Sequence, residues 1–378
     1  MRIVCIIPTM GPGGAERAMS YLIAHLAKRH AVTLLTFERP DKPSFYPVPT
    51  SVKYLRVDQL GGYGLQRVLQ IMARARLMRR TVKTRTPDVV ISFMVGINIT
   101  ALTSCVGLGI PIVVSERIDP SEHCIGRVKE LARAYTYPLA RLIVVQTSRV
   151  ASYFPPSLQP KIRIVGNAVV PAPVTAQPVA VDRNGRKRII AVGRCDPQKG
   201  FDRLIDAFAL IANHYPDWDV VIVGDGPERL QLEDRVRRGG LEARINITGF
   251  VSDVYQELSA AQLIAFPSRN EGFPNALAEG LAVGLPAVGY KGVSGVEDLI
   301  IEGTTGLLVD QEDEIAGLAR ALSTLMADAH LRVRLGNAAL QHIRQWAPDR
   351  MFALWDEVLR EAVAGSQNLS RRIAPVPS

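Results

Sequence analysis

Short apolar runs alternate with amphipathic stretches along the first half of the chain. The stretches Ala15–Lys28 and Leu65–Lys83 place apolar residues at helical spacing. Because strands that alternate with helices form parallel sheets covered on both faces, this half is predicted to be a doubly wound α/β domain. Its predicted strands are Arg2–Ile7, Ala31–Phe37, Val52–Arg56, Asp88–Ser92, Pro111–Ser115 and Arg141–Gln146.

The alternation breaks over residues 171–186 and then resumes. This segment holds three prolines and an Asn-Gly pair, a composition typical of a linker. The strands predicted beyond it are Arg188–Val192, Asp219–Val223, Arg244–Ile247, Leu263–Phe266, Pro286–Gly289 and Gly306–Val309.

The pattern therefore predicts two Rossmann-like domains, residues 1–170 and 187–347, which we expect to face each other across a cleft. A last helix over residues 348–364 could cross back to the first domain. The polar, proline-containing residues 365–378 are expected to be disordered.

Composition narrows the class of protein. Hydrophobic residues make up 47% and charged residues 21% of the chain, as in globular proteins. No stretch reaches the ~18 apolar residues of a membrane-spanning helix, and the N-terminus lacks the features of a signal peptide. The cysteines are scattered without a Cys-x-x-Cys pair, which argues against a structural zinc site or a disulfide framework. We expect a cytoplasmic protein.

Charge is divided unevenly between the two halves. Residues 1–170 hold 23 Lys and Arg against 9 Asp and Glu, a net charge of +14, and the remainder holds 22 against 27, or −5, which together give +9. Such asymmetry indicates an anionic partner for the first half, which could be nucleic acid, a membrane surface or a phosphorylated substrate.

The pair Gly13-Gly14 follows the first predicted strand and opens a helix. Glycine lets a ligand approach the backbone, and the N–H groups of a helix start favour an anion. A plain strand–helix turn explains the same residues equally well.

A cationic loop, Gly193–Gly200, follows the first strand of the second domain. Its Arg194 and Lys199 stand at the carboxyl end of a strand, where open α/β sheets bind ligands, and two cations suit a diphosphate. A solvated loop is the alternative, but position and chemistry agree on a binding role.

Two carboxylates, Glu271 and Glu279, flank a helix start marked by Pro274, whose fixed φ is tolerated there. Glu279 lies about one helical turn beyond the start. The order suits a nucleotide-sugar, with sugar hydroxyls on Glu271, the diphosphate on the amides and ribose on Glu279. The alternative is an acid that favours the helix dipole and a surface Glu. The amides expected to face an anion belong to Asn275, Ala276 and Leu277.

Two further turns follow strands of the second domain. Gly224–Pro227 is expected to shape the nucleotide pocket. Phe250 and Val251, beyond the strand Arg244–Ile247, could wall a nucleobase, although core packing explains Phe250 equally well.

Taken in order, these motifs resemble those of family 4 retaining glycosyltransferases of the GT-B fold. The matching motifs are Gly-Gly-Ala-Glu-Arg at 13–17, Gly-Arg-x4-Lys-Gly at 193–200, Gly-Asp-Gly-Pro at 224–227 and Glu-x7-Glu at 271–279. The resemblance covers nearly the whole chain, and the ordered set is more specific than any single motif.

The resemblance implies roles for individual residues. Arg194 and Lys199 would hold the donor diphosphate, Glu271 would bind the donor sugar, and Glu279 the ribose. Gly13 and Gly14 would lie near the diphosphate and the reacting carbon. The diphosphate would be bound without a metal, and the nucleotide-sugar would be a substrate, so that no cofactor is needed.

The first domain departs from the common family pattern. Many relatives carry a His after the strand that here ends in Ser115-Glu116-Arg117, and the chain resembles a Ser-Glu-Arg subgroup of N-acetylgalactosaminyltransferases. His123 is either the family's His displaced or a surface residue. The candidate acceptor-binding residues are Glu16, Arg17, Glu116, Arg117 and His123.

A basic helix is predicted over Leu65–Arg85. Such a helix can attach to an anionic membrane or bind an acceptor's diphosphate, and a solvated basic face is the alternative. Its cations are Arg67, Arg74, Arg76, Arg79, Arg80, Lys83 and Arg85.

The residues and the resemblance together imply a cytoplasmic, metal-independent retaining glycosyltransferase, peripheral on the inner face of the membrane. It would move a hexose or N-acetylhexosamine from a UDP-sugar to a hydroxyl of a polyprenyl-diphosphate-linked glycan. A soluble sugar or sugar-phosphate acceptor and a nucleotide-sugar epimerase activity stay open as alternatives. No motif with interleaved aromatics accompanies the basic charge, so nucleic acid is not expected as a partner.

Overall fold

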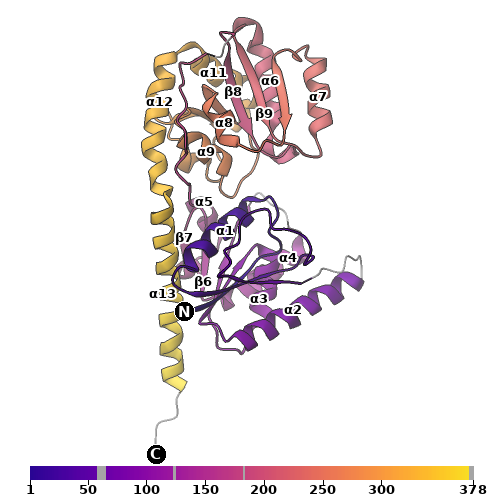
Figure 1. Ribbon diagram of the computed structural model, residues 1–378, viewed down its shortest axis with the longest axis vertical. Coiled ribbons are helices and arrows are strands. Elements are labelled where there is room, and N and C mark those ends of the chain that lie inside the picture. Colours follow the sequence, from indigo (N-terminus) through magenta and orange to yellow (C-terminus); the bar gives the residue numbers. More distant parts are fainter. Residues whose placement is uncertain (58–64, 122–124, 182–183, 374–378) are drawn as a thin grey trace, which may run out of the picture. The chain divides into compact units, whose positions relative to one another are not determined.

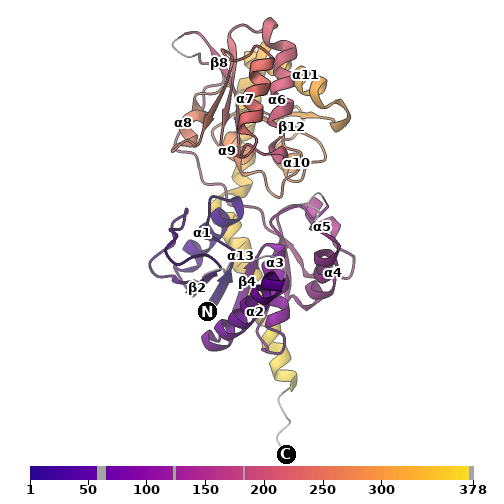
Figure 2. The ribbon, with the colours of Figure 1, turned by 90° about the vertical axis from the view of Figure 1, so that its right-hand side faces the viewer.

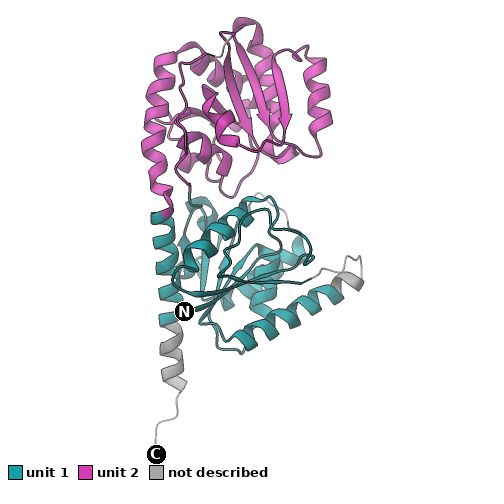
Figure 3. Cartoon of the chain, viewed as in Figure 1, with its two compact units in different colours: residues 1–168, 349–378 teal, residues 169–348 magenta. Residues whose placement is uncertain are grey.

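The computed structural model describes residues 1–57, 65–121, 125–181 and 184–373, with the backbone alone at 65–68 and 365–373. The chain forms two compact units (Figure 3). The first joins Met1–Ala168 with the chain from Asp349 onwards, and the second spans Val169–Pro348. The segment predicted as a linker belongs to the second unit, because Val169 and Ala176 are buried in its core and Ala176 N–H donates to Val283 O at 2.7 Å.

The sheet of the first unit consists of parallel strands in the order β3-β2-β1-β4-β5-β6-β7. Six of them match predicted strands, and β7 is a three-residue strand too short to show a pattern. The strands are β1 (Arg2–Ile6), β2 (Ala31–Thr36), β3 (Lys53–Arg56), β4 (Val89–Phe93), β5 (Ile112–Ser115), β6 (Leu142–Val145) and β7 (Ile162–Ile164).

Helices cover both faces of this sheet, and the strands alternate between two cores. Ile3 and Cys5 face one core, while Val4 and Ile6 face the other. Figure 2 shows α2 and α3 in front of the sheet and α13 behind it. The helices are α1 (Gly14–Leu26), α2 (Leu65–Arg85), α3 (Val95–Ser104), α4 (Arg127–Thr136), α5 (Ser148–Tyr153) and α13 (Pro348–Ile373).

Helix α13 completes the first unit from the other end of the chain (Figure 1). Its buried Trp355 lies 6.0 Å from Phe93, centroid to centroid, and Asp356 pairs with His25 at 3.1 Å. The prediction of disorder is wrong for residues 365–373, through which the helix continues. It continues because no proline interrupts the sequence before Pro375. The rest of the predicted tail, 374–378, lies outside the described residues.

The sheet of the second unit is also parallel, in the order β10-β9-β8-β11-β12-β13. Its strands lie within two residues of the predicted ones. They are β8 (Lys187–Val192), β9 (Trp218–Val223), β10 (Ile245–Gly249), β11 (Leu263–Phe266), β12 (Ala287–Tyr290) and β13 (Gly306–Val309).

The strand order of the second unit reverses between β8 and β11. The chain moves outward from β8 to β10, crosses back to β11, and then moves outward on the other side. Because parallel crossovers are right-handed, α6 and α9 cover opposite faces. Ligands bind at the carboxyl ends of strands at such a switch point, so the loops after β8 and β11 are the expected site. The helices are α6 (Phe201–Ile211), α7 (Arg229–Arg238), α8 (Val254–Ser259), α9 (Asn275–Ala282), α10 (Val296–Leu299), α11 (Glu314–Ala327) and α12 (Ala329–His342).

Candidate functional site

The loops after β8 and β11 are bonded directly to each other. Arg269 N–H donates to Gln198 O and the Gln198 side chain donates to Asn270 O, both at 2.8 Å. Gly200 has a φ of +64°, and a Cβ there would lie 2.1 Å from Pro267 O. Glycine is therefore required for the two loops to approach this closely.

This approach brings together two residues that the sequence analysis placed in one site. Lys199 Nζ donates to Glu271 Oε1 at 2.6 Å, across 72 positions of sequence. The Lys199 side chain lies over Gly193, where a Cβ would come within 3.1 Å of Lys199 Cδ. An ammonium group has three N–H donors, so Lys199 can hold Glu271 and still bind an anion.

Arg194 is exposed and bonded within the loop that carries it. Its side chain is 70% exposed, and its Nε donates to Asp196 Oδ2 at 2.5 Å. Asp196 is buried, and its other oxygen has no hydrogen-bond partner among the described residues. The sequence analysis overlooked Asp196, which orients Arg194 and offsets part of its charge.

Helix α9 begins at Asn275, directly after Pro274, as predicted. Asn275 N–H donates to Phe273 O at 2.9 Å, so this amide is used within the turn. The amides of Ala276 and Leu277 belong to the first turn, whose N–H groups have no acceptor within the helix. Glu279 lies buried further along α9.

Glycines also allow the loop after β8 to pack closely against the loop after β9. A Cβ on Gly224 would lie 1.7 Å from Gly193 O, and one on Gly226 would lie 2.4 Å from Cys195 O. Cys195 N–H donates to Asp225 O at 2.9 Å. The turn Gly224–Pro227 is therefore packed closely against the cationic loop.

Phe250 and Val251 follow β10 and differ in their surroundings. Phe250 is 72% exposed, which excludes core packing for its ring, whereas Val251 packs partly against the core of the second unit. The Phe250 ring thus lies exposed at the carboxyl edge of the sheet, where a base would bind if this edge holds a nucleotide.

In the first unit, the Gly13-Gly14 turn is covered by an acidic side chain. A Cβ on Gly13 would lie 2.1 Å from Glu16 Oε2, and Glu16 Oε1 accepts from Thr9 Oγ1 at 3.2 Å. Burial raises the pKa of Glu16, which favours its neutral form next to this helix start. Gly14 begins α1, and Arg17 lies in its first turns.

Glu116 lies inside the first unit rather than on its surface. It accepts a hydrogen bond from Tyr137 Oη and lies 3.9 Å from Arg133. Asn98 donates to Tyr137 Oη at 3.0 Å and continues this buried network. Burial raises the pKa of Glu116, and Tyr137 and Arg133 partly oppose that shift.

Arg117, next to Glu116, is also buried but has different neighbours. Its Nη2 donates to Asn167 Oδ1 at 2.6 Å, and its guanidinium carbon lies 4.4 Å from the centre of the Phe93 ring. Asn167 follows β7 and was not assigned a role from the sequence. His123 lies outside the described residues.

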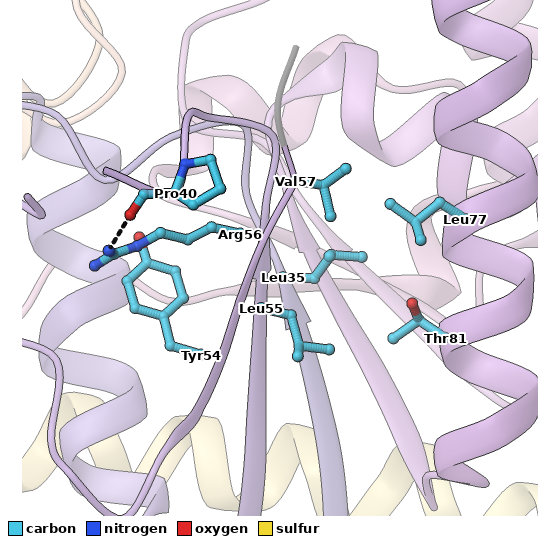
Figure 4. A pocket seen from close by; sticks show the side chains of 8 residues that line it. All are labelled: Leu35, Pro40, Tyr54, Leu55, Arg56, Val57, Leu77 and Thr81. Atoms are coloured by element: carbon cyan, nitrogen blue, oxygen red, sulfur yellow. Dashed lines mark hydrogen bonds between the residues drawn. The ribbon is translucent and has the colours of Figure 1, made fainter. Parts of the chain in front are cut away.

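A separate hollow of about 620 Å³ lies between β2, β3 and α2 (Figure 4). Its walls are mainly apolar, and Arg56 at its edge donates to Pro40 O at 3.0 Å. None of the predicted site residues lines it. Its lining residues are Leu35, Pro40, Tyr54, Leu55, Arg56, Val57, Leu77 and Thr81.

An Asp-Trp-Asp triplet, Asp217–Asp219, lies at the amino end of β9, far along the strand from the carboxyl edge. Asp217 pairs with Lys187 at 2.5 Å and Asp219 pairs with Arg244 at 3.2 Å. Both carboxylates are thus engaged in ion pairs of the second unit. Within the described ranges, no group of three or more His, Cys, Asp or Glu side chains could hold a metal ion.

Within the described part of the chain, no helix combines the length and the apolar character that crossing a membrane requires.

Comparison with known families gives two matches, one for each unit. A family described as Glycosyltransferase Family 4 matches residues 12–172, and one described as Glycosyl transferases group 1 matches residues 176–342.

Among curated proteins, the chain is similar to a Campylobacter jejuni enzyme named GalNAc-alpha-(1->4)-GalNAc-alpha-(1->3)-diNAcBac-PP-undecaprenol alpha-1,4-N-acetyl-D-galactosaminyltransferase. The two are 27% identical over 96% of this chain and 99% of the relative.

Among solved structures, the fold is similar to a sucrose-phosphate synthase from Thermosynechococcus elongatus, with a TM-score of 0.81 and 17% identity over 97% of this chain and 100% of the other. It is also similar to Anabaena Alr3699/HepE in complex with UDP, with a TM-score of 0.76 and 18% identity over 95% and 100% of the two chains.

Proposed function

This chain is a glycosyltransferase of the GT-B fold, and from that premise we propose that it transfers a hexose or N-acetylhexosamine from a UDP-sugar to a hydroxyl of a polyprenyl-diphosphate-linked glycan, with retention of configuration. The observation that carries the proposal is the contact of Lys199 with Glu271 at the switch point of the second sheet. This contact places a cation that can bind phosphate beside a carboxylate that can bind sugar hydroxyls.

The donor would lie along the carboxyl edge of the second unit. Lys199 and Arg194 bind the diphosphate together with the first amides of α9, and Arg194 exchanges Asp196 for phosphate. Glu271 binds the sugar and Glu279 the ribose, while Phe250 stacks on uracil. The similarity to a protein solved with UDP supports the choice of nucleotide.

Charge separation governs the proposed reaction. As the anomeric C–O bond breaks, the sugar becomes cationic and the leaving diphosphate gains negative charge. Lys199, Arg194 and the α9 amides oppose that negative charge, and such preorganised groups are often the largest catalytic contribution. No metal is then needed. The acceptor attacks from the face that the diphosphate leaves, and a phosphate oxygen takes the hydroxyl proton.

The first unit is proposed to bind the acceptor and to attach to the membrane. The relative's name specifies an undecaprenol-linked glycan, which would hold the enzyme at the inner face of the membrane. On α2, Arg76, Arg80 and Lys83 are exposed together with apolar Leu69 and Met72. Cations beside apolar side chains favour an anionic lipid surface.

Helix α4 adds an apolar stripe to the same side of the sheet. Val128, Leu131 and Tyr135, at helical spacing, are all exposed, and Arg127 and Lys129 flank them. Helices α2, α3 and α4 pack side by side. This layer therefore combines charge and exposed apolar area, as an interfacial surface requires.

The donor site is tested by removing its two central side chains. Lys199→Ala and Glu271→Ala should each lower kcat by about 100-fold or more, since they contact the charges that change in the reaction. Transfer would be measured with UDP-sugars and a lipid-linked glycan, with and without EDTA, which should leave wild-type turnover unchanged.

Arg237→Ala, a change to an exposed ion pair on α7, serves as the control and should keep full activity. Near-normal turnover of either site variant at saturating donor would contradict the assignment. Transfer to a soluble sugar phosphate alone, or release of an isomerised UDP-sugar without acceptor, would identify one of the two alternative activities.

Membrane attachment is tested with vesicles. The protein should sediment with anionic vesicles and less with neutral ones, and salt should weaken binding by screening the α2 cations. Replacing Arg76, Arg80 and Lys83 by Gln should reduce sedimentation several-fold, as should replacing Val128 and Leu131 by Ser. Equal binding of all proteins to both kinds of vesicle would count against this surface.

A further inference from the structure

Arg117 is a buried cation surrounded by neutral groups. Its side chain belongs to a residue that is 8% exposed, and its partners are Asn167 Oδ1 at 2.6 Å, Ser115 Oγ at 3.4 Å and the ring of Phe93. No carboxylate within the described part of the chain forms an ion pair with it. Its Nε has no hydrogen-bond partner there.

Other buried arginines of the chain are compensated. Arg133 pairs with Glu130, and Arg203 pairs with Glu314. Arg332 donates to the carbonyl groups of Leu325 and Met326, at the C-terminal end of α11, where the helix dipole is negative. Among the described residues, Arg117 has neither kind of compensation.

A buried charge without an opposite charge is destabilising, because burial removes its hydration and nothing replaces it. The same burial lowers the pKa of Arg117 to about 9. Proteins depart from sound local packing in this way mainly at functional sites. A ligand that carries negative charge would provide the missing compensation.

Arg117 lies at the edge of the first sheet where folds of this kind bind ligands. It follows β5, and Asn167 follows β7, so both lie at the carboxyl edge of the first sheet. Arg117 and Asn167 line a small cavity together with Gly166, Tyr21 of α1 and Trp355 of α13. Arg117 therefore lies beside a small cavity, at the edge where such sheets bind ligands.

We propose that Arg117 binds a phosphate group of the acceptor, through the guanidinium donors that its protein partners leave unused. The proposal rests on the proposed function for the acceptor and deepens it, since it assigns one residue to the diphosphate of the lipid-linked glycan. Guanidinium suits this role because its planar donors match phosphate oxygens.

Arg117→Met provides the kinetic test. With the diphosphate-linked glycan, the variant should raise the acceptor KM by about 10- to 100-fold, the effect of losing a hydrogen bond to a charged group. With the same glycan lacking phosphate, variant and wild type should be equal, and the KM of the UDP-sugar should not change. Arg117→Lys should recover part of the loss.

Equal effects on both glycans would overturn the proposal. A raised KM for the UDP-sugar with an unchanged acceptor KM would also overturn it, because the phosphate would then belong to the donor.

The melting temperature of the variants distinguishes a binding role of Arg117 from a structural one. Arg117→Met removes an uncompensated charge, and Asn167 keeps Gln146 as a donor at 2.9 Å, so the melting temperature should stay or rise. The matched control Arg133→Met breaks a buried ion pair and should lower it. A fall for Arg117→Met as large as that for Arg133→Met would overturn a binding role.

Pyrophosphate tests the site without any transfer reaction. In the Lys199→Ala background, which weakens the donor site, inorganic pyrophosphate should raise the melting temperature, and adding Arg117→Met should abolish that rise. This experiment does not require lipid-linked glycans to be acceptors. It therefore distinguishes failure of the Arg117 proposal from failure of the proposed function. An equal rise in both proteins would overturn the proposal.

Discussion

Neighbouring residues of the first unit show how a single position changes the chemistry of a side chain. Glu116 is held by Tyr137 and Arg133 inside a network, whereas Arg117 meets only neutral groups. Adjacent positions in a strand-end loop point to different surroundings, so the acid and the cation do not pair. Sequence alone identified both as site candidates but could not separate the packed acid from the unpaired cation.

The network around Glu116 makes stability depend on pH. Burial raises its folded pKa above the ordinary value of 4.5. Between the two values the folded state keeps a proton that the unfolded state releases, so the free energy of unfolding falls as pH rises through this window. Glu116→Gln has no proton to release and still accepts from Tyr137. The melting temperature of Glu116→Gln should therefore increase relative to that of the wild type as the pH rises above 4.5, measured by thermal unfolding at stepped pH.

A constant difference between the two proteins across that range would show that Glu116 titrates normally.

The residues proposed to bind the donor were easier to find from the sequence than the side chains that hold them. Lys199 and Glu271 both follow central strands, and parallel sheets bring such loops to one edge. Arg194 was placed correctly by the same argument, but its bond to Asp196 depends on local loop geometry that no periodic pattern encodes.

At the scale of elements, the turns at strand ends depend on glycines that permit close contact. Gly224 lies against Gly193 O, where a Cβ would be only 1.7 Å away. Gly224→Ala should therefore displace the cationic loop, destabilise the protein by about 1–3 kcal/mol and raise the KM of the donor. Chemical denaturation and donor kinetics would measure both effects.

Gly96→Ala is the matched control, since it lies in α3 with nothing within 4 Å of its Cβ position. Alanine is favoured over glycine in a helix, so this variant should be as stable as the wild type or more so. If both variants behaved alike, the close packing of the turn would not matter.

Buried strands were predicted well, whereas several helices were missed. Strands β11 and β13 have the predicted bounds. Helix α3 was overlooked because its sequence is apolar on most sides, and α4 because its apolar stripe faces solvent instead of a core. Such segments form through tertiary contacts, which a local pattern does not contain.

At the scale of the whole molecule, the first unit depends on both ends of the chain. Trp355, Val358 and Leu359 of α13 are buried in its core. A chain that ends at Pro348 should therefore leave this unit unfolded or poorly packed, because the lost apolar contacts are worth several kcal/mol (~3–5 for a buried Trp alone). The second unit should unfold cooperatively and still bind UDP.

Calorimetry of residues 1–348 and of the second unit alone would test this prediction. A native-like first unit in the shortened chain would show that α13 is dispensable.

The return of α13 also sets an order for biosynthesis. A ribosome adds about 5–20 residues each second, so Val169–Pro348 is complete and free to fold while the last segment of its neighbour is still untranslated. Until termination, the first sheet has one apolar face without its final cover. A stop codon ahead of α13 would consequently yield a polypeptide with a folded second unit and an incompletely covered first sheet, which is a target for chaperones and proteases.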